Sequence, residues 1–248
     1  MTRERFEQQL QELQRDILRM GKMVEEEMLL ALQALEELDV KLAQQVHTAD
    51  DAVNKLRFET EEKCFTVLVT QQPAARDLRA VVTVMNMIVD LERMGDQAKG
   101  IAKVIPHLRR QKKQVPLPEL QQMGTLVVNM LRQTMQAYTN DSVTLARIVA
   151  AQDDEVDKLY SQVFAKLVNQ MADDNLAEEI ATSYERLRVA RELERFGDLA
   201  TNIAERVIYR VTGQIKELNT DSRSVIRPKQ PKAGASHFRR LGRVSQTC

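Results

Sequence analysis

Two pairs of acidic side chains have a spacing that could hold a cation. Glu92 and Asp96 lie four residues apart, and Glu194 and Asp198 repeat that spacing later in the chain. Residues four apart lie on one face of an α-helix, so each pair would present two carboxylates side by side. Carboxylate oxygens suit Mg²⁺, Mn²⁺ or Ca²⁺, and iron or zinc remain open. Each pair is therefore a candidate metal site.

The acidic faces continue along the helix as apolar side chains. At about 100° per residue, Leu78 and Met85 fall on the same line as Glu92 and Asp96. We therefore expect this line to be a core face that runs into two acids. The corresponding line later in the chain comprises Ile180, Leu187, Glu194 and Asp198.

Further acids lie on the preceding helical segments and also continue as apolar lines. Asp50 and Asn54 lead towards Phe58 and Phe65. The other line comprises Asp153, Asp157, Tyr160, Phe164, Leu167 and Met171. If these helices pack antiparallel to the helices of the Glu–Asp pairs, the two sets of acids would come close together. A cation would then relieve the repulsion between the carboxylates near the core. The predicted metal ligands are Asp50, Glu92, Asp96, Asp153, Asp157, Glu194 and Asp198.

Plainer interpretations of the acidic pairs remain open. An acidic pair on a helix is commonly a solvated face. Arg93 and Arg195 could neutralise the acids as ordinary ion pairs. Gly95 and Gly197 each cost a helix about 1 kcal/mol relative to alanine, which points to a structural role in close helix packing.

Apolar side chains at spacings of three and four predict long helices throughout. One runs over about 3–38, a second begins after Asp39, and a third runs from Pro73 to Ile105, where Pro106 is expected to stop it. Three more follow Pro118, and the last ends near Thr212 before a glycine.

The helices form an internal duplication. Residues 91–96 (LERMGD) match 193–198 (LERFGD) at an offset of 102, and 50–54 match 153–157 at an offset of 103. The sequence therefore predicts an all-α protein of two tandem three-helix bundles, with six long helices. Repeat one spans 1–105 and repeat two spans 119–212, joined by a linker at 106–118 and followed by a basic, disordered tail at 213–248.

Charge is unevenly distributed along the chain. Residues 213–248 carry a net charge of about +6, so the body carries about −6, which argues against nucleic acid as a partner. The N-terminal segment is polar and unlike a signal peptide, and the longest apolar stretch is too short to span a bilayer. These features predict a cytoplasmic protein.

The motifs of enzymes are missing from the sequence. It contains no glutamate–histidine pair of the di-iron type, no phosphate-binding GxxxxGK and no GxSxG. His47, His107 and His237 are isolated from one another. The sequence therefore gives no positive case for catalysis, although a metal-dependent bundle enzyme and a purely structural bundle remain alternatives.

Residues 5–212 resemble the PhoU family of phosphate-signalling accessory proteins. The resemblance rests on the duplicated Glu-Arg-x-Gly-Asp motifs, the acids of the second helices, and the stretch QPAARDLR at 72–79. It implies two three-helix bundles in a cytoplasmic, often dimeric protein. It further implies a negative regulator of the phosphate-starvation response, which links the ATPase of the phosphate ABC transporter to a sensor histidine kinase and moderates phosphate uptake. Such a protein meets the membrane only through its partners.

The resemblance also implies that the acidic side chains bind metal. Some family members bind multinuclear metal clusters at these motifs, and the matching positions here are the seven predicted ligands. The metal would be a divalent or trivalent ion such as Fe, Zn, Mn or Mg. Asn54 departs from the acidic pattern, so the site of repeat one is expected to bind more weakly. The tail after Gly213 has no counterpart in the resemblance.

Overall fold

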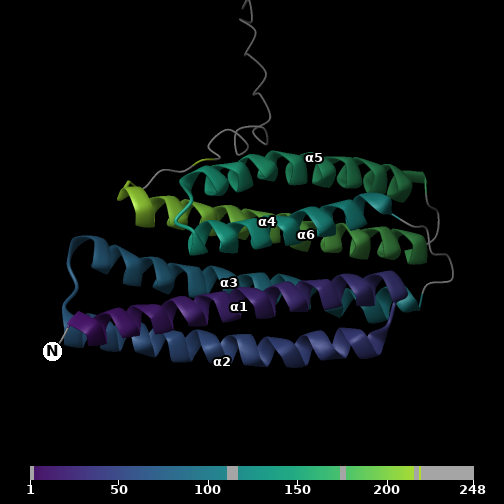
Figure 1. Cartoon of the computed structure of the whole chain (residues 1–248). Helices are drawn as coiled ribbons and strands as arrows, with labels where there is room; N and C mark the ends of the chain where they lie inside the picture. The colour runs from purple at the N-terminus through teal and green to yellow at the C-terminus, as the bar shows by residue number, and fades with distance from the viewer. Residues whose placement is uncertain (1–2, 111–116, 174–176, 215–217, 219–248) are drawn as a thin grey trace, which may run out of the picture.

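Six long α-helices make up the described part of the chain, stacked as two three-helix bundles (Figure 1). The computed structural model describes residues 3–110, 117–173, 177–214 and 218. Within these residues there is no strand, and no helix has an apolar stretch long enough to cross a bilayer. The predicted fold class is confirmed. The helices are α1 (Arg3–Glu37), α2 (Val40–Gln71), α3 (Ala75–Arg109), α4 (Pro118–Thr139), α5 (Val143–Asp173) and α6 (Ala177–Thr212).

Local sequence signals set several of the helix ends. The Asp39 carboxylate accepts hydrogen bonds from the backbone N–H groups of Lys41 and Leu42, at 2.6 and 3.3 Å, and so caps α2. Pro118 is the first residue of α4, where its missing N–H would have had no helical partner. α6 ends before Gly213, whose φ of 74° is the left-handed conformation that glycine favours. These ends agree with the predictions from sequence.

The two bundles share one hydrophobic core. α3 packs against α6 and α1 against α4, while α2 and α5 form the two outer sides of the stack (Figure 1). Two glycines at matching repeat positions allow α1 and α4 to approach closely. A Cβ on Gly21 would lie 2.7 Å from Met135 Cε, and one on Gly124 would lie 2.6 Å from a Leu32 methyl group. The repeats are therefore joined along their length and not only by a linker.

Helix α3 continues through Pro106 and ends at Arg109, so the predicted stop at Pro106 is wrong. Proline removes one backbone N–H and therefore one helical hydrogen bond. Ile105 and Leu108 on either side of it are buried, and the burial of their apolar surface favours the continued helix. The described chain resumes at Leu117, which is also buried, so the predicted linker at 106–118 is helical or packed at both of its ends.

The apolar lines that continue the acidic faces are only partly buried. Leu167 is fully buried, and Met85, Tyr160 and Leu187 pack against the core, but other members of these lines are exposed. Leu78 and Ile180, on the lines of the motif acids, are each 40% exposed. Leu91 and Leu193, which directly precede the motif acids, are the fully buried side chains. The acids therefore lie at the edge of the core. The aromatic side chains on the acidic faces of α2 and α5 that are exposed are Phe58, Phe65 and Phe164.

Gly213 and Leu218, at the beginning of the predicted tail, make hydrogen bonds to α6. The Gly213 N–H donates to the Tyr209 carbonyl at 2.8 Å. The Leu218 N–H donates to a Glu205 carboxylate oxygen at 2.7 Å, and Leu218 packs against the core. The predicted disorder of 213–248 is therefore wrong at these two positions, while 215–217 and 219–248 lie outside the described residues.

Candidate functional site

Repeat one, which comprises α1–α3, brings its three predicted acids together. Asp50 on α2 is buried, while on α3 Glu92 is half-buried and Asp96 is exposed. Burial raises the pKa of Glu92, and the negative charges of Asp96 and Asp50 raise it further. The acids of α2 and α3 thus lie close enough to interact, as the sequence predicts.

A lysine that sequence reasoning missed lies between two of these acids. Lys99 Nζ contacts Asp50 Oδ2 and lies 2.9 Å from Asp96 Oδ1. The Asn54 amide also donates to Asp50 Oδ2, at 2.9 Å. Burial alone would lower the pKa of Lys99, but its hydrogen bonds to the two carboxylates, with their charges, raise it. The available signal in the sequence was the spacing of three residues between Asp96 and Lys99.

Glu27 on α1 is a second residue that sequence reasoning missed. It is 1% exposed, and neither carboxyl oxygen has a hydrogen-bond partner among the described residues. Burial, followed by the charge of Asp50, raises the pKa of Glu27 to about 9, so this group is protonated at neutral pH. A Cβ on Gly95 would lie 3.1 Å from Glu27 Oε2 and 3.4 Å from Asp50 Oδ1. The motif glycine therefore makes room for two carboxyl groups.

In repeat two, which comprises α4–α6, three of the predicted acids lie close enough for their charges to interact: Asp153, Asp157 and Glu194. Asp153 on α5 is buried, Asp157 and Glu194 are half-buried, and Asp198 is exposed. Burial raises the pKa of Glu194, and the charges of Asp157 and Asp153 raise it further. A Cβ on Gly197 would lie 3.5 Å from Asp153 Oδ1, so this acid of α5 packs on the motif glycine of α6.

A surface arginine forms an ion pair with Glu194 in repeat two. Arg191 Nη1 lies 2.9 Å from Glu194 Oε1, and the arginine side chain is 54% exposed. Exposed pairs of this kind contribute roughly 0–1 kcal/mol. Glu194 Oε2 is buried and accepts no hydrogen bond from the residues that the structure describes. In repeat one, Arg93 makes its ion pair with Asp90, at 4.0 Å, and not with the motif acid beside it.

The repeats differ at three positions around their acids. Repeat two lacks the lysine and the buried glutamate of repeat one, and has a fourth motif carboxylate where repeat one has an amide. By the offsets of 102 and 103 residues, Thr201 corresponds to Lys99, Met130 to Glu27 and Asp157 to Asn54.

The two clusters fit a metal ion to different degrees. Among the described residues, no three His, Cys, Asp or Glu side chains are arranged as metal ligands. In repeat one, Lys99 already pairs with two of the predicted ligands and competes with a metal for them, while Asp50 Oδ1 and both Glu27 oxygens are buried and accept no hydrogen bond within the described residues. In repeat two, the donors are all carboxylates, which suit a hard cation, and Glu194 Oε2 is buried and unpaired within the described structure.

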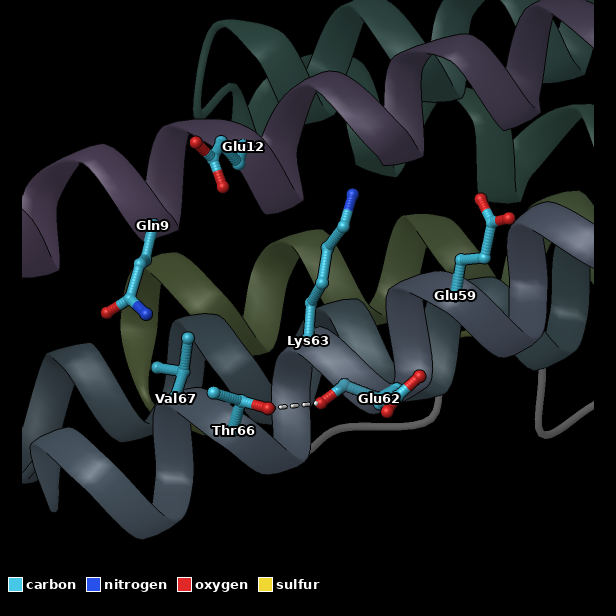
Figure 2. Close-up of a pocket in the computed structure, with 7 residues that line it drawn as sticks. All are labelled: Gln9, Glu12, Glu59, Glu62, Lys63, Thr66 and Val67. Carbon is cyan, nitrogen blue, oxygen red and sulfur yellow. Dashed lines mark hydrogen bonds between the residues drawn. The ribbon is translucent and has the colours of Figure 1, made fainter.

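A groove of about 330 Å³ lies between α1 and α2 and contains none of the predicted ligands (Figure 2). Its charged lining is Glu12, Glu59, Glu62 and Lys63. Figure 2 shows Lys63 extending between Glu12 and Glu59, and its ammonium pairs with Asp16 at 2.6 Å. Three carboxylates against one neutralised ammonium repel an anion, so the groove does not suit inorganic phosphate.

The family model of the PhoU domain matches residues 17–105 and 120–207. The chain belongs to the PhoU family. The two matches fall on α1–α3 and α4–α6, so each three-helix repeat is one PhoU domain. Both acidic motifs, with their glycines, lie inside the matched ranges.

One curated PhoU relative and two PhoU crystal structures match this chain over the whole of their own length. The phosphate-specific transport system accessory protein PhoU homolog of Clostridium acetobutylicum is 37% identical, covering 88% of this chain and 100% of its own. The crystal structure of the phosphate transport system regulatory protein PhoU from Streptococcus pneumoniae has a TM-score of 0.80 at 32% identity, over 86% of this chain and 100% of that chain. The crystal structure of PhoU from Pseudomonas aeruginosa has a TM-score of 0.81 at 34% identity. That match covers 84% of this chain and 100% of the other.

Proposed function

We propose that this protein is an accessory regulator of a phosphate transport system. The observation that carries the proposal is the match to PhoU proteins whose names state that role, each of which this chain covers over 100% of its length. Both PhoU domains are present in one chain, so the comparison concerns the whole folded unit.

In detail, the protein acts in the cytoplasm as a homodimeric adaptor. It links the ATPase of the phosphate ABC transporter to a sensor histidine kinase, moderates phosphate uptake and represses the phosphate-starvation response. It works by binding and not by catalysis. Support comes from the family resemblance and from the exposed Phe58 and Phe65 on outer helix α2, because exposed aromatic side chains are suited to contacts with other proteins.

Deletion of the gene is expected to leave phosphate-starvation genes active in phosphate-rich medium. The reason is that the proposed repressing signal from transporter to kinase would be lost. A starvation-responsive reporter measures the effect, and the intact chain supplied from a plasmid should restore repression. Normal repression in the deletion strain would contradict the regulatory role.

The proposal includes a divalent or trivalent cation in repeat two, held by Asp153, Asp157, Glu194 and Asp198. The bound cation would supply positive charge to carboxylates that otherwise repel one another. Support comes from the all-carboxylate donor set, the unpaired Glu194 Oε2 within the described chain and the absence of a lysine equivalent to Lys99. The ion would stabilise the fold, because it binds the folded state only.

Manganese is expected to raise the melting temperature of chelator-treated protein, and Glu194→Ala with Asp198→Ala should abolish the rise. At a hundredfold excess over Kd, a ligand adds about 2.7 kcal/mol, which corresponds to roughly 5–10 °C for a chain of this size. The matched control is Glu92→Ala with Asp96→Ala in repeat one, which should retain the shift. No shift in the unaltered protein, together with no stoichiometric metal by elemental analysis, would remove the cation from the proposal.

A further inference from the structure

We propose that Lys99 is the resident cation of repeat one, so that repeat two is the only one of the two acidic clusters open to a metal ion. The stoichiometry follows: one metal-binding cluster per chain and not two. This inference rests on the cation proposed for repeat two, but it concerns a different set of side chains, and the two can fail separately.

The position of Lys99 carries the inference. Its ammonium contacts Asp50 on α2 and lies 2.9 Å from Asp96 on α3. A metal held by the predicted ligands would have to join the same two helices through the same two carboxylates. The Lys99 side chain is only 21% exposed, and the Asp50 side chain is 3% exposed, so the contact is largely shielded from water. Shielding makes such a pair stronger and less sensitive to salt than a surface pair.

The hydrogen bond from Asn54 to Asp50 also supports Lys99 as the resident cation. Asp50 Oδ2 accepts a hydrogen bond from the Asn54 amide at 2.9 Å in addition to its contact with Lys99. A metal at this oxygen would displace both donors and separate a mostly buried ammonium from Asp50, which leaves it only the more exposed Asp96. Removing one member of a buried ion pair is strongly unfavourable, because the other charge stays buried. Repeat one is therefore closed to a competing cation.

Repeat two provides an internal comparison. Thr201 stands at the position of Lys99 and Asp157 at the position of Asn54. Both changes favour a metal: a neutral hydroxyl replaces the competing ammonium, and a carboxylate replaces an amide. Arg191 does not substitute for Lys99, because it binds Glu194 from an exposed position and leaves the second oxygen of that carboxylate unpaired among the described residues.

The test exchanges the two residues between the repeats. Full-length, chelator-treated protein is titrated with MnCl₂ in a calorimeter, and elemental analysis gives the metal content per chain. Lys99→Thr, alone or with Asn54→Asp, should add a second binding event that Asp50→Asn removes. Lys99→Arg keeps the cation and should leave the stoichiometry of the unaltered protein. Thr201→Lys should weaken binding in repeat two at least tenfold. Circular dichroism confirms that each variant is folded.

The outcomes separate the two proposals. If the unaltered protein binds manganese in both repeats, with half of it lost in Asp50→Asn, Lys99 does not close repeat one and the inference is overturned. If the unaltered protein binds none but Lys99→Thr with Asn54→Asp does, the metal site of repeat two fails while the role of Lys99 stands. If neither Lys99 variant gains metal over the unaltered protein, the inference is wrong.

Discussion

Replacement of Phe196 by alanine is expected to lower the free energy of unfolding by about 3–5 kcal/mol. Phe196 lies inside the motif of repeat two, is fully buried and is among the largest side chains of the core. Its removal takes away apolar contacts and leaves a cavity that the packed helices fill only in part. For a chain of this length the melting temperature should fall by roughly 6–20 °C, measured by calorimetry or circular dichroism.

Ile180→Ala is the matched control on the same helix. Ile180 is 40% exposed, so its truncation should cost less than about 1 kcal/mol. The pair also tests the correction to the sequence-based core. Equal losses in the two variants would mean that the acidic face of α6 is buried after all, contrary to the structure.

Glu27→Gln is expected to stabilise the metal-free protein by about 1–3 kcal/mol at pH 8 and to flatten its stability profile at alkaline pH. Burial and the charge of Asp50 raise the pKa of Glu27 from 4.5 to about 9 in the folded state. The contribution of this group to stability is complete below about pH 4.5, and it is lost as the pH rises towards 9. Glutamine has nearly the same volume as glutamate and stays neutral over this pH range.

Denaturant unfolding from pH 5 to pH 9 measures this effect. Glu26→Gln is the control, because Glu26 is exposed on the same helix and pairs with Lys22 only at the surface, at 3.7 Å. Its profile should follow that of the unaltered protein within about 0.5 kcal/mol. If Glu27→Gln is instead the less stable protein at pH 8, Glu27 is ionised in the fold and the Lys99 ammonium holds its charge.

The fold could be predicted because its determinants are local or repeated. Spacings of three and four give the helices, Asp39 and Pro118 mark helix starts, and Gly213 marks an end. The duplicated LER–GD motifs locate equivalent positions in the two repeats. Each of these signals comes from a few neighbouring residues, so a single sequence is enough to find it.

The features that sequence reasoning missed depend on which face of a helix points to its neighbours in the fold. The run Glu25–Glu27 is uniform in sequence, yet only Glu27 is fully buried, because α1 turns that position towards Asp50 and Gly95. Lys99 has an ordinary spacing on α3, and its importance comes from an acid on another helix. Leu78 and Ile180 lie in the first turns of α3 and α6 and are 40% exposed, whereas Met85 and Leu187 on the same lines pack against the core, a difference that periodicity alone does not resolve.

The pairing of α3 with α6 gives the duplicated protein a mechanical property. Each of these helices carries an acidic motif towards its own outer helix and packs against the other across the boundary between repeats. At that boundary a Cβ on Gly100 of α3 would lie 2.8 Å from the carboxyl carbon of Glu192 on α6, so the glycine makes room for this side chain. A close-packed interior has low compressibility and transmits strain. The two acidic motifs, 102 residues apart in sequence, therefore lie on helices that share one packed interface.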